Sequence, residues 1–463
     1  MNGYEKNMFF EDRSNRFCCL PFQKLSYGLG HIFNDLCAAM WFSYTLFYLQ
    51  VVLDMESTTA GMLLMIGQIV DSLATPAVGY CIDYTKHRRL WHLGGTIAVT
   101  IGFSLIFSLK PDSFTLSIIL YYITGIFLFQ IGWATVQISH LSIIPEISRS
   151  YKHSSDLTAI RYIASVCCNI CVYSITLMIL KNDETKDSIG PNDFYKFKEI
   201  AVSIIFIGLL SSMLFYCGLL GKYDQEYEPL LRDEIVDIEM VELHGMNQKH
   251  FLKQAIIYCV SIMYMCSRLF TTLNLIYMPL YIEERGSLND IGKDRIRQTV
   301  ASIPLTSYLT SFVTSLLLKC LVGIVSDKIT YCFGSIIGLV TSIWIGVGLS
   351  TKTDLELYSI AALLGVTGST TMVSSLCLTA NFVKTNGIGG GMVYSFVTFT
   401  DKLISGSVVF IVQHLQCASR NSCPYFYKHA LTFICASVSL IAILALISLH
   451  IKNRRGMHLL TTS

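Results

Sequence analysis

The pentapeptide Gly79-Tyr80-Cys81-Ile82-Asp83 returns in related form later in the chain as Gly323-Ile324-Val325-Ser326-Asp327. Each copy closes a long apolar run, and the two runs hold the same place in two sets of such runs. A Gly-x-x-x-Asp pair alone is common by chance, so the evidence for a repeat is the equivalent placement of the two copies. The repeat predicts that the chain is built from two related halves.

The composition excludes a soluble protein. Of 463 residues, 52% are hydrophobic and only 14% are charged. The charges crowd into short stretches between apolar runs of about 20 to 28 residues, each long enough to cross a hydrocarbon core of about 30 Å. The net charge of +2 is not concentrated in a basic block, so the sequence gives no indication of nucleic-acid binding.

These runs predict an all-α membrane protein with twelve transmembrane helices in two six-helix bundles. The first six are expected at residues 25–52, 58–82, 90–109, 114–144, 157–180 and 200–221. The second six are expected at residues 254–282, 299–322, 331–350, 355–382, 389–414 and 428–451. The predicted domains are a tail at 1–24, a bundle at 25–221, a linker at 222–253, a bundle at 254–451 and a tail at 452–463.

Basic residues set the expected orientation, because Lys and Arg near helix ends are retained in the cytosol. Both termini are predicted to be cytosolic. The residues that favour this orientation follow the second and the last predicted helix: Lys86, Arg88, Arg89, Lys452, Arg454 and Arg455. The polar start of the chain lacks the pattern of a cleaved signal peptide, so the first helix is expected to serve as the insertion signal.

Most of the sixteen cysteines fall inside apolar runs, where they are expected to pack as small hydrophobic residues. Cys417 and Cys423 differ because they share one short polar loop. They are candidates for a disulfide if that loop faces an oxidising lumen, and for two free thiols if it does not.

Six ionisable side chains lie deep inside predicted helices. An unpaired charge at bilayer depth costs at least about 2.5 kcal/mol, so such groups face a bundle interior or an aqueous cavity. They are the leading candidates for binding a substrate or a proton, with structural ion pairing as the alternative. The six are Asp35, Asp71, Arg161, Arg268, Asp401 and Lys402. Asp401 and Lys402 are adjacent and point about a quarter-turn apart, so they are also candidates for pairs with other helices that act as a gate.

Uncharged polar and aromatic residues accompany these charges on the same helix faces. Gln130, Trp133, Gln137 and His140 form one stripe on the fourth helix. The stripe fits a cavity lining, and interhelical hydrogen bonding is nearly as good an explanation. The remaining candidates for the cavity lining are His31, Asn34, Gln68, Asn169, Tyr264, Tyr394 and Thr398.

The repeat at Gly79, Asp83, Gly323 and Asp327 resembles the loop motif of the major facilitator fold. The resemblance implies a latch, in which the glycine permits close helix approach and the acid interacts with a neighbouring helix terminus. The alternative is a simple helix-end glycine with a solvated acid.

A wider resemblance covers both halves. The segments 27–44, 67–76, 129–140, 157–162, 268–274 and 401–403 resemble the major facilitator cysteine transporters of lysosomes and melanosomes. That resemblance implies import of cysteine from the cytosol into an acidic organelle. Composition and spacing carry no such information.

More distantly, the chain resembles bacterial sugar and cation symporters at Asp35, Asp71, Arg161 and Lys402. Thr75 stands where those proteins have a second acid on the second helix. Because a hard cation requires several oxygen ligands with enough negative charge, this departure argues against a sodium site. Proton coupling and uncoupled exchange both stay open.

The linker at 222–253 contains an acidic dileucine pattern with Glu226, Leu230 and Leu231. In a cytosolic loop this pattern predicts sorting to lysosomes through adaptor proteins, and the alternative is a solvated charge run. The sequence shows no metal-ligand spacing and no arrangement of nucleophile and base, so neither an enzyme nor a cofactor is expected.

The sequence hypothesis is therefore a carrier that moves cysteine into lysosomes or related organelles by alternating access. Arg161 or Arg268 is expected to hold the carboxylate, and Asp35 or Asp71 the ammonium. One alternative is a proton-coupled symporter of a sugar or another small metabolite. Another is a membrane sensor or scaffold that does not transport, which six buried charges disfavour.

Overall fold

The computed structural model describes residues 25–85, 87–147, 151–181, 189–220, 255–288, 296–321, 325–348, 354–386, 390–416 and 424–461. These ranges contain twelve long α-helices, as the sequence predicts. The N-terminal half comprises α2 (Ile32–Phe47), α3 (Ser57–Thr85), α4 (Arg88–Ser108), α5 (Leu116–Ile147), α6 (Tyr151–Lys181) and α7 (Phe194–Leu220). The C-terminal half comprises α9 (Ala255–Leu288), α10 (Ile296–Leu321), α11 (Asp327–Val347), α12 (Asp354–Asn386), α13 (Gly390–His414) and α14 (Phe426–Thr461).

The helices are long and apolar enough to form a multi-pass membrane protein. Ten of them contain segments with the length and hydropathy of a membrane span. The other two are α2, which has 16 residues, and α6, which contributes the shorter apolar segment Ala164–Leu180. Large apolar side chains such as Phe206 and Leu444 are exposed on the outside of the bundle, as expected for a surface that faces lipid.

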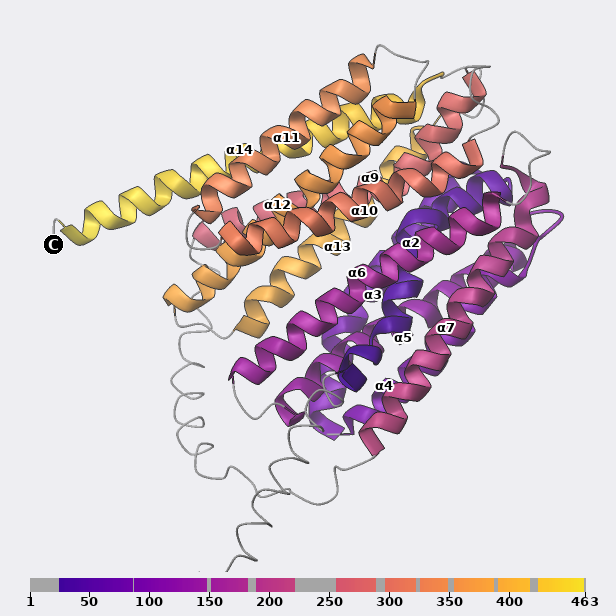
Figure 1. The fold of residues 1–463 in the computed structure, drawn as a ribbon, viewed down its shortest axis with the longest axis horizontal. Helices are drawn as coiled ribbons and strands as arrows, with labels where there is room; N and C mark the ends of the chain where they lie inside the picture. The colour runs from indigo at the N-terminus through magenta and orange to yellow at the C-terminus, as the bar shows by residue number, and fades with distance from the viewer. Residues whose placement is uncertain are drawn as a thin grey trace, which may run out of the picture.

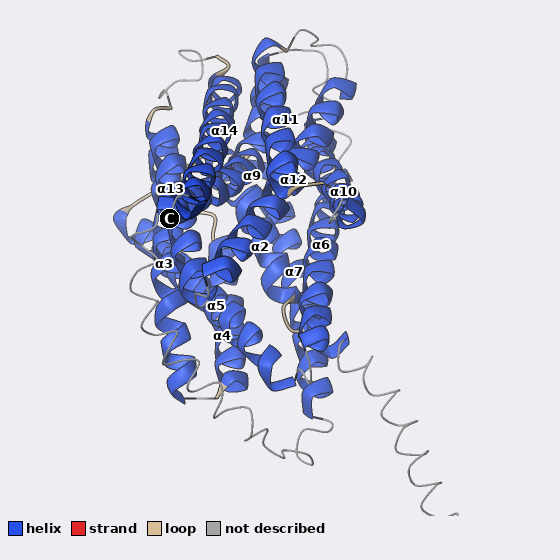
Figure 2. Cartoon of the chain, turned by 90° about the vertical axis from the view of Figure 1, so that its left-hand side faces the viewer, coloured by secondary structure: helices blue, strands red, loops and turns tan. Residues whose placement is uncertain are grey.

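The two halves form separate groups of helices that meet along one interface. Figure 1 shows the indigo-to-magenta helices on one side and the orange-to-yellow helices on the other. Contacts between the halves run through α3 and α13, α6 and α10, and α2 and α9. Figure 2 shows that the regular structure of the described chain is helical throughout.

The first predicted helix, at 25–52, is not continuous. Residues 25–29 are helical, a turn occupies Gly30 and His31, and α2 then runs to Phe47 before a π-helix, η1 (Tyr48–Val52). Two side chains from other helices bind carbonyls at the turn: His140 donates to the Tyr27 carbonyl and His92 to the Gly30 carbonyl. Carbonyls engaged by tertiary partners are less available to the helix, which accounts for the break.

The other boundaries differ from the predictions by a few residues, with one larger exception at the C-terminus. Helix α14 continues to Thr461, through most of the segment at 452–463 that was predicted as a tail. It projects beyond the rest of the bundle in Figure 1. A short 3-10 helix, η2 (Pro191–Asp193), precedes α7.

Candidate solute site

Lys402 on α13 forms an ion pair that crosses between the two halves. Its Nζ lies 2.6 Å from Oδ2 of Asp71 on α3 and donates to Oγ1 of Thr75 at 3.2 Å. Thr75 also donates to Oδ1 of Asp71 at 3.3 Å. Asp71 is only 1% exposed, and the Lys402 side chain is 16% exposed. The carboxylate is therefore buried and depends on a cation supplied by the other half.

Asp401, the neighbour of Lys402, pairs within its own half. Nε of Arg268 on α9 donates to Oδ2 of Asp401 at 3.2 Å, and Ser405 donates to Oδ1 at 3.1 Å. The Asp401 side chain is 6% exposed, whereas that of Arg268 is 36% exposed. Arg268 thus has an accessible face in the middle of a membrane helix.

A third polar group lies in the N-terminal half, where α2 meets α6. Nδ1 of His31 is 3.0 Å from Oδ2 of Asp35, and its Nε2 is 3.0 Å from Nη2 of Arg161. Asn34 also points its amide nitrogen at this Nε2, at 3.3 Å. Because a guanidinium can only donate, Nε2 must carry the lone pair and the ring proton must sit on Nδ1, toward Asp35. His31 is therefore a neutral bridge between an acid and a base.

Trp133 on α5 connects these groups. Its backbone carbonyl accepts a hydrogen bond from Asn34 at 3.4 Å, and Nζ of Lys402 lies 5.4 Å from the centre of its ring. A lysine ammonium over an indole face is a favourable cation–π arrangement. The N-terminal polar group and the pair that crosses the halves thus border the same tryptophan.

The sequence analysis missed His92, which lies behind this site on α4. Its Nε2 donates to the Gly30 carbonyl at 3.0 Å, so its Nδ1 accepts from the Tyr216 hydroxyl at 2.6 Å. His140 stacks on Tyr27, with ring centres 4.2 Å apart. Within the described residues, Nδ1 of His140 is buried without a hydrogen-bond partner. His140 is thus a packed side chain of the bundle interior.

Several other predicted lining residues are placed by helix packing. Gln68 and Gln130 are buried, at 9% and 1% exposure, while Gln137 and Thr398 are partly exposed. Asn169 bonds to its own helix, donating to the Ser165 carbonyl at 2.8 Å. Tyr264 is 7% exposed and belongs to an apolar cluster that also contains Ile257, Phe382 and Val397. Tyr264 is therefore packed largely against apolar side chains.

The residues of the predicted latch can be placed only in part. Gly79 lies on α3 and Asp327 is the first residue of α11. Asp83 is in the last turns of α3, whereas its counterpart Asp327 begins the next helix, so the two acids do not hold equivalent positions. The candidates that cannot be placed are the side chains of Asp83 and Tyr394, together with Gly323, Glu226, Leu230, Leu231, Cys417 and Cys423.

Helices α3 and α13 pack closely on one side of the Asp71–Lys402 pair. A Cβ atom at Gly61 would lie 2.5 Å from Cβ of Gln413, and one at Gly406 would lie 2.8 Å from Cβ of Gln68. Each helix thus offers a glycine to a glutamine of the other. We call this contact, formed by Gly61, Gln413, Gly406 and Gln68, the glycine seam.

Beyond the glycine seam, a polar cluster joins the halves at the end of the bundle, which we call the Gln50 end. Gln50 on η1 donates to Oε1 of Gln413, and the Tyr427 hydroxyl lies 2.7 Å from Oε1 of Gln50. Glu284 on α9 accepts from the backbone nitrogens of Tyr427 and Lys428, each at 3.0 Å. The hydrogen bonds of Gln50 thus hold the halves in contact at the Gln50 end, and we call it closed in this sense. Gln50, Gln413 and Tyr427 were not singled out from the sequence, because a polar residue near a helix end is usually solvated.

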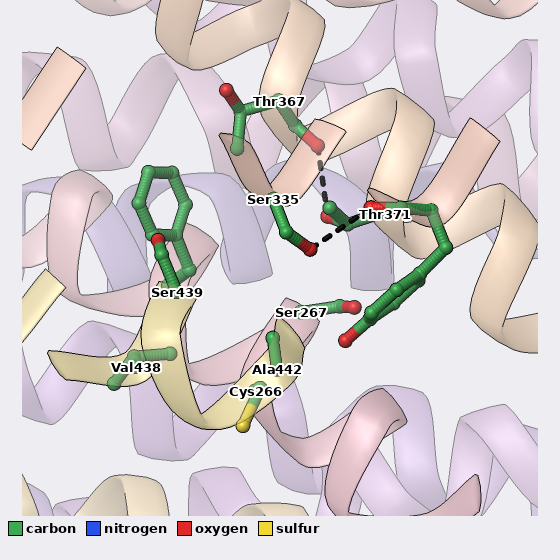
Figure 3. A pocket seen from close by; sticks show the side chains of 10 residues that line it. Cys266, Ser267, Ser335, Thr367, Thr371, Val438, Ser439 and Ala442 are labelled. Carbon is green, nitrogen blue, oxygen red and sulfur yellow. Dashed lines mark hydrogen bonds between the residues drawn. The ribbon is translucent and has the colours of Figure 1, made fainter. Parts of the chain in front are cut away.

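A small pocket lies inside the C-terminal half, among α9, α11, α12 and α14 (Figure 3). Ser267, Ser335, Thr367, Thr371 and Ser439 line it together with apolar side chains. Most of these hydroxyls donate to carbonyls of their own helices, as Thr371 does to Thr367 at 2.8 Å and Ser335 to Tyr331 at 2.9 Å. The pocket contains none of the six buried charges and is separate from the candidate solute site.

Comparison with known proteins places the chain among transporters. The family described as MFS/sugar transport protein matches residues 26–451. The protein called Major facilitator superfamily domain-containing protein 12 is 33% identical in Mus musculus, over 93% of this chain and 94% of that protein. In Homo sapiens it is 33% identical over 92% of each chain. The fold resembles a partially occluded inward-open structure of the xylose transporter XylE from E. coli, with a TM-score of 0.63, 14% identity, and coverage of 92% of this chain and 98% of that one.

Proposed function

The chain belongs to the MFS/sugar transport protein family and is a secondary transporter of the membrane, and we propose that its solute is cysteine, carried from the cytosol into lysosomes or related organelles. The transport cycle is alternating access, in which the two six-helix halves rock about a central site. The resemblance of both halves to the organellar cysteine transporters supports the choice of solute.

The observation that carries this proposal is the Asp71–Lys402 pair. It joins the halves with a 2.6 Å contact between two charges, one of which is fully buried. A contact of this kind at the interface that must open and close is suited to a charged or zwitterionic solute rather than a neutral one. Cysteine has one carboxylate and one ammonium. The site offers an acid and a base for them in each of two places: Asp71 and Lys402 beside Trp133, and Asp35 and Arg161 on either side of His31.

Candidate contacts follow from the accessible faces of the charged groups. Arg161 or Arg268 holds the carboxylate, because a guanidinium offers two parallel donors to a carboxylate. Asp35 or Asp71 holds the ammonium. The side chains of Asp35 and Arg268 are 13% and 36% exposed, so both are reachable without unfolding a helix.

The closed Gln50 end supports a direction for the first step of the cycle. If the termini are cytosolic, the Gln50 end faces the organelle lumen, and a molecule closed there receives its solute from the cytosol. The dileucine pattern at Glu226, Leu230 and Leu231 supports delivery of the protein to lysosomes through adaptor binding.

Uptake of labelled cysteine into lysosome-rich vesicles tests the proposal. Arg161→Ala and Asp71→Asn are expected to abolish uptake, since each removes a charge that contacts the solute or holds its site together. Lys196→Met is a matched control, because Lys196 also pairs with an acid, Asp193 at 3.5 Å, but at the start of α7. Unchanged uptake in both site variants would overturn the assignment. Purified protein in proteoliposomes, with and without a pH gradient, measures the activity directly.

A proton-coupled symporter of a sugar or another small metabolite is the second candidate function. The neutral His31 favours it, because Nε2 of this ring accepts a hydrogen bond from Arg161 and loses that charged donor whenever Arg161 moves to a solute, so that a proton can bind there. Inhibition of cysteine uptake by sugars or other metabolites, with proton entry that follows those solutes and not cysteine, would support this candidate over the first.

A further inference from the structure

We propose that a zwitterionic amino acid enters the site by inserting into the Asp71–Lys402 ion pair, with its ammonium taking the place of Lys402 on Asp71 and its carboxylate receiving Lys402. This inference rests on the proposed function and specifies which groups of the site recognise the solute. The proposed function left two candidate bases for the carboxylate and two candidate acids for the ammonium. This inference assigns both roles to the one ion pair that lies across the interface.

The geometry around Asp71 is that of an ammonium site. Nζ of Lys402 contacts Oδ2 of Asp71 at 2.6 Å and Oγ1 of Thr75 at 3.2 Å, and it lies over the ring of Trp133. Two oxygens and an indole face suit any primary ammonium, because they contact the charge and its donors and not the carbon chain. The α-ammonium of an amino acid can therefore occupy the place of the lysine ammonium.

Charge balance explains why the incoming solute must be a zwitterion. Separation of a buried pair without replacement leaves an uncompensated charge, and Asp71 is only 1% exposed. A cation satisfies Asp71 and leaves Lys402 unpaired, while an anion does the opposite. A neutral sugar satisfies neither. An amino acid supplies both charges at once and leaves the net charge of the site unchanged.

Insertion also changes the interface. Asp71 belongs to α3 and Lys402 to α13, which are packed together at the adjoining glycine seam. One direct contact is replaced by two contacts with the solute between them, so the helices are held less closely. Solute binding thus loosens the contact between the halves, and no coupled ion is needed to do so.

A reciprocal change of specificity tests this inference. The probes are cysteine, cysteamine, which has no carboxylate, and 3-mercaptopropionate, which has no amine. Binding is measured as the ligand-induced rise in Tm of the purified full-length chain in detergent at pH 6, where the thiols are neutral and the other groups are charged. In the wild type, cysteine is expected to bind more tightly than either analogue.

The two single variants are expected to shift in opposite directions. Lys402→Met leaves Asp71 in need of a cation, so cysteamine should gain about 10- to 100-fold relative to cysteine, the range expected for a lost hydrogen bond to a charged group. Asp71→Asn leaves Lys402 in need of an anion, so 3-mercaptopropionate should gain by a similar factor. Ser405→Ala is the control, because it alters the neighbouring Arg268–Asp401 pair within one half and removes no charge: it is expected to leave the order of the three probes unchanged.

Several outcomes would overturn the inference. It is wrong if both single variants fold and keep the wild-type order of probes. If either single variant fails to fold, the charge-exchanged double variant Asp71→Lys/Lys402→Asp tests the inference instead. It keeps the ion pair and should bind cysteine in the reverse orientation. A folded double variant that does not bind cysteine would overturn insertion. A wild type that binds glycine and not cysteine would refute the proposed solute and leave insertion supported.

Discussion

Two adjacent residues of α13 make ion pairs with opposite consequences. Asp401 pairs with Arg268 inside the C-terminal half, where both helices move together, and Ser405 adds a second bond. Lys402 pairs with Asp71 in the other half, across the interface that opens in the proposed transport cycle. The first pair can stabilise a fold, whereas the second can report on the state of the carrier. Similar chemistry thus serves stability or switching according to which helices it joins.

The largest expected effect is a difference between the two pairs in how much each contributes to the free energy of unfolding. Arg268→Met leaves Asp401 buried without its base and is expected to lower the free energy of unfolding by about 3–5 kcal/mol. Lys402→Met is expected to cost less stability, since the halves can part and hydrate Asp71, but to lose more transport. Thermal unfolding in detergent and cysteine uptake measure the two quantities. Equal losses of stability, with equal transport, would remove the distinction between the pairs.

A smaller effect is expected from the glycine seam beside the crossing pair. Gly61→Ala places a methyl group 2.5 Å from Cβ of Gln413, and overpacking of this kind costs about 1–3 kcal/mol. This cost arises only when the Gln50 end is closed, so the population of the closed state should fall by about 5- to 150-fold. Distances between spin labels at the exposed residues 56 and 429 would report the opening.

Gly94→Ala on α4 is the matched control for this prediction. A Cβ atom at Gly94 meets nothing within 4 Å, and an alanine is favoured over a glycine inside a helix. The label distances should therefore stay unchanged, with equal or higher stability. A shift of similar size in Gly94→Ala would show that the loss of glycine, rather than the contact with Gln413, caused the opening.

Tyr427→Phe tests the polar cluster at the Gln50 end. The variant removes a hydroxyl that lies 2.7 Å from Oε1 of Gln50, a contact between the halves. A hydrogen bond of this kind contributes about 1 kcal/mol, so the closed state should lose about fivefold in population. The same label distances measure it, and a fully closed variant would mean that the hydroxyl does not hold this end together.

The smallest effect on the label distances is expected from Ser405→Ala within the C-terminal half. It removes the 3.1 Å hydrogen bond to the Asp401 carboxylate and should cost about 1.5–3 kcal/mol of stability, with label distances at the Gln50 end unchanged. Ser407→Ala is the control on the same helix, because Ser407 is partly exposed and donates only to the Leu403 carbonyl. Movement of the labels in Ser405→Ala would place the Arg268–Asp401 pair in the switch after all.

The sequence was sufficient to predict the fold because membrane spans follow from length and hydropathy. The prediction for 200–221 meets α7 at Phe194–Leu220, and that for 331–350 meets α11 at Asp327–Val347. The break at Gly30 and His31 could not be predicted from the sequence. That break depends on His92 and His140, which reach the turn from other helices.

The candidate site was predictable in its members and not in its partners. Burial cost alone selects Asp71, Asp401 and Lys402 from the sequence. Which acid meets which base depends on how each helix is rotated and on how the halves pack. The sequence thus names Asp35 and Arg161 as separate candidates, and the structure places His31 between them.

The glycine seam has a consequence for how this chain can vary through descent. A side chain at position 61 would meet Cβ of residue 413, so it requires a glycine at 413 or a wider spacing of the two helices, and position 406 depends on position 68 in the same way. Substitutions at the two ends of each contact are thus expected to occur together in lineages that alter the seam. Two positions that change together in this way would show that the contact of the closed state has been maintained during the evolution of the family.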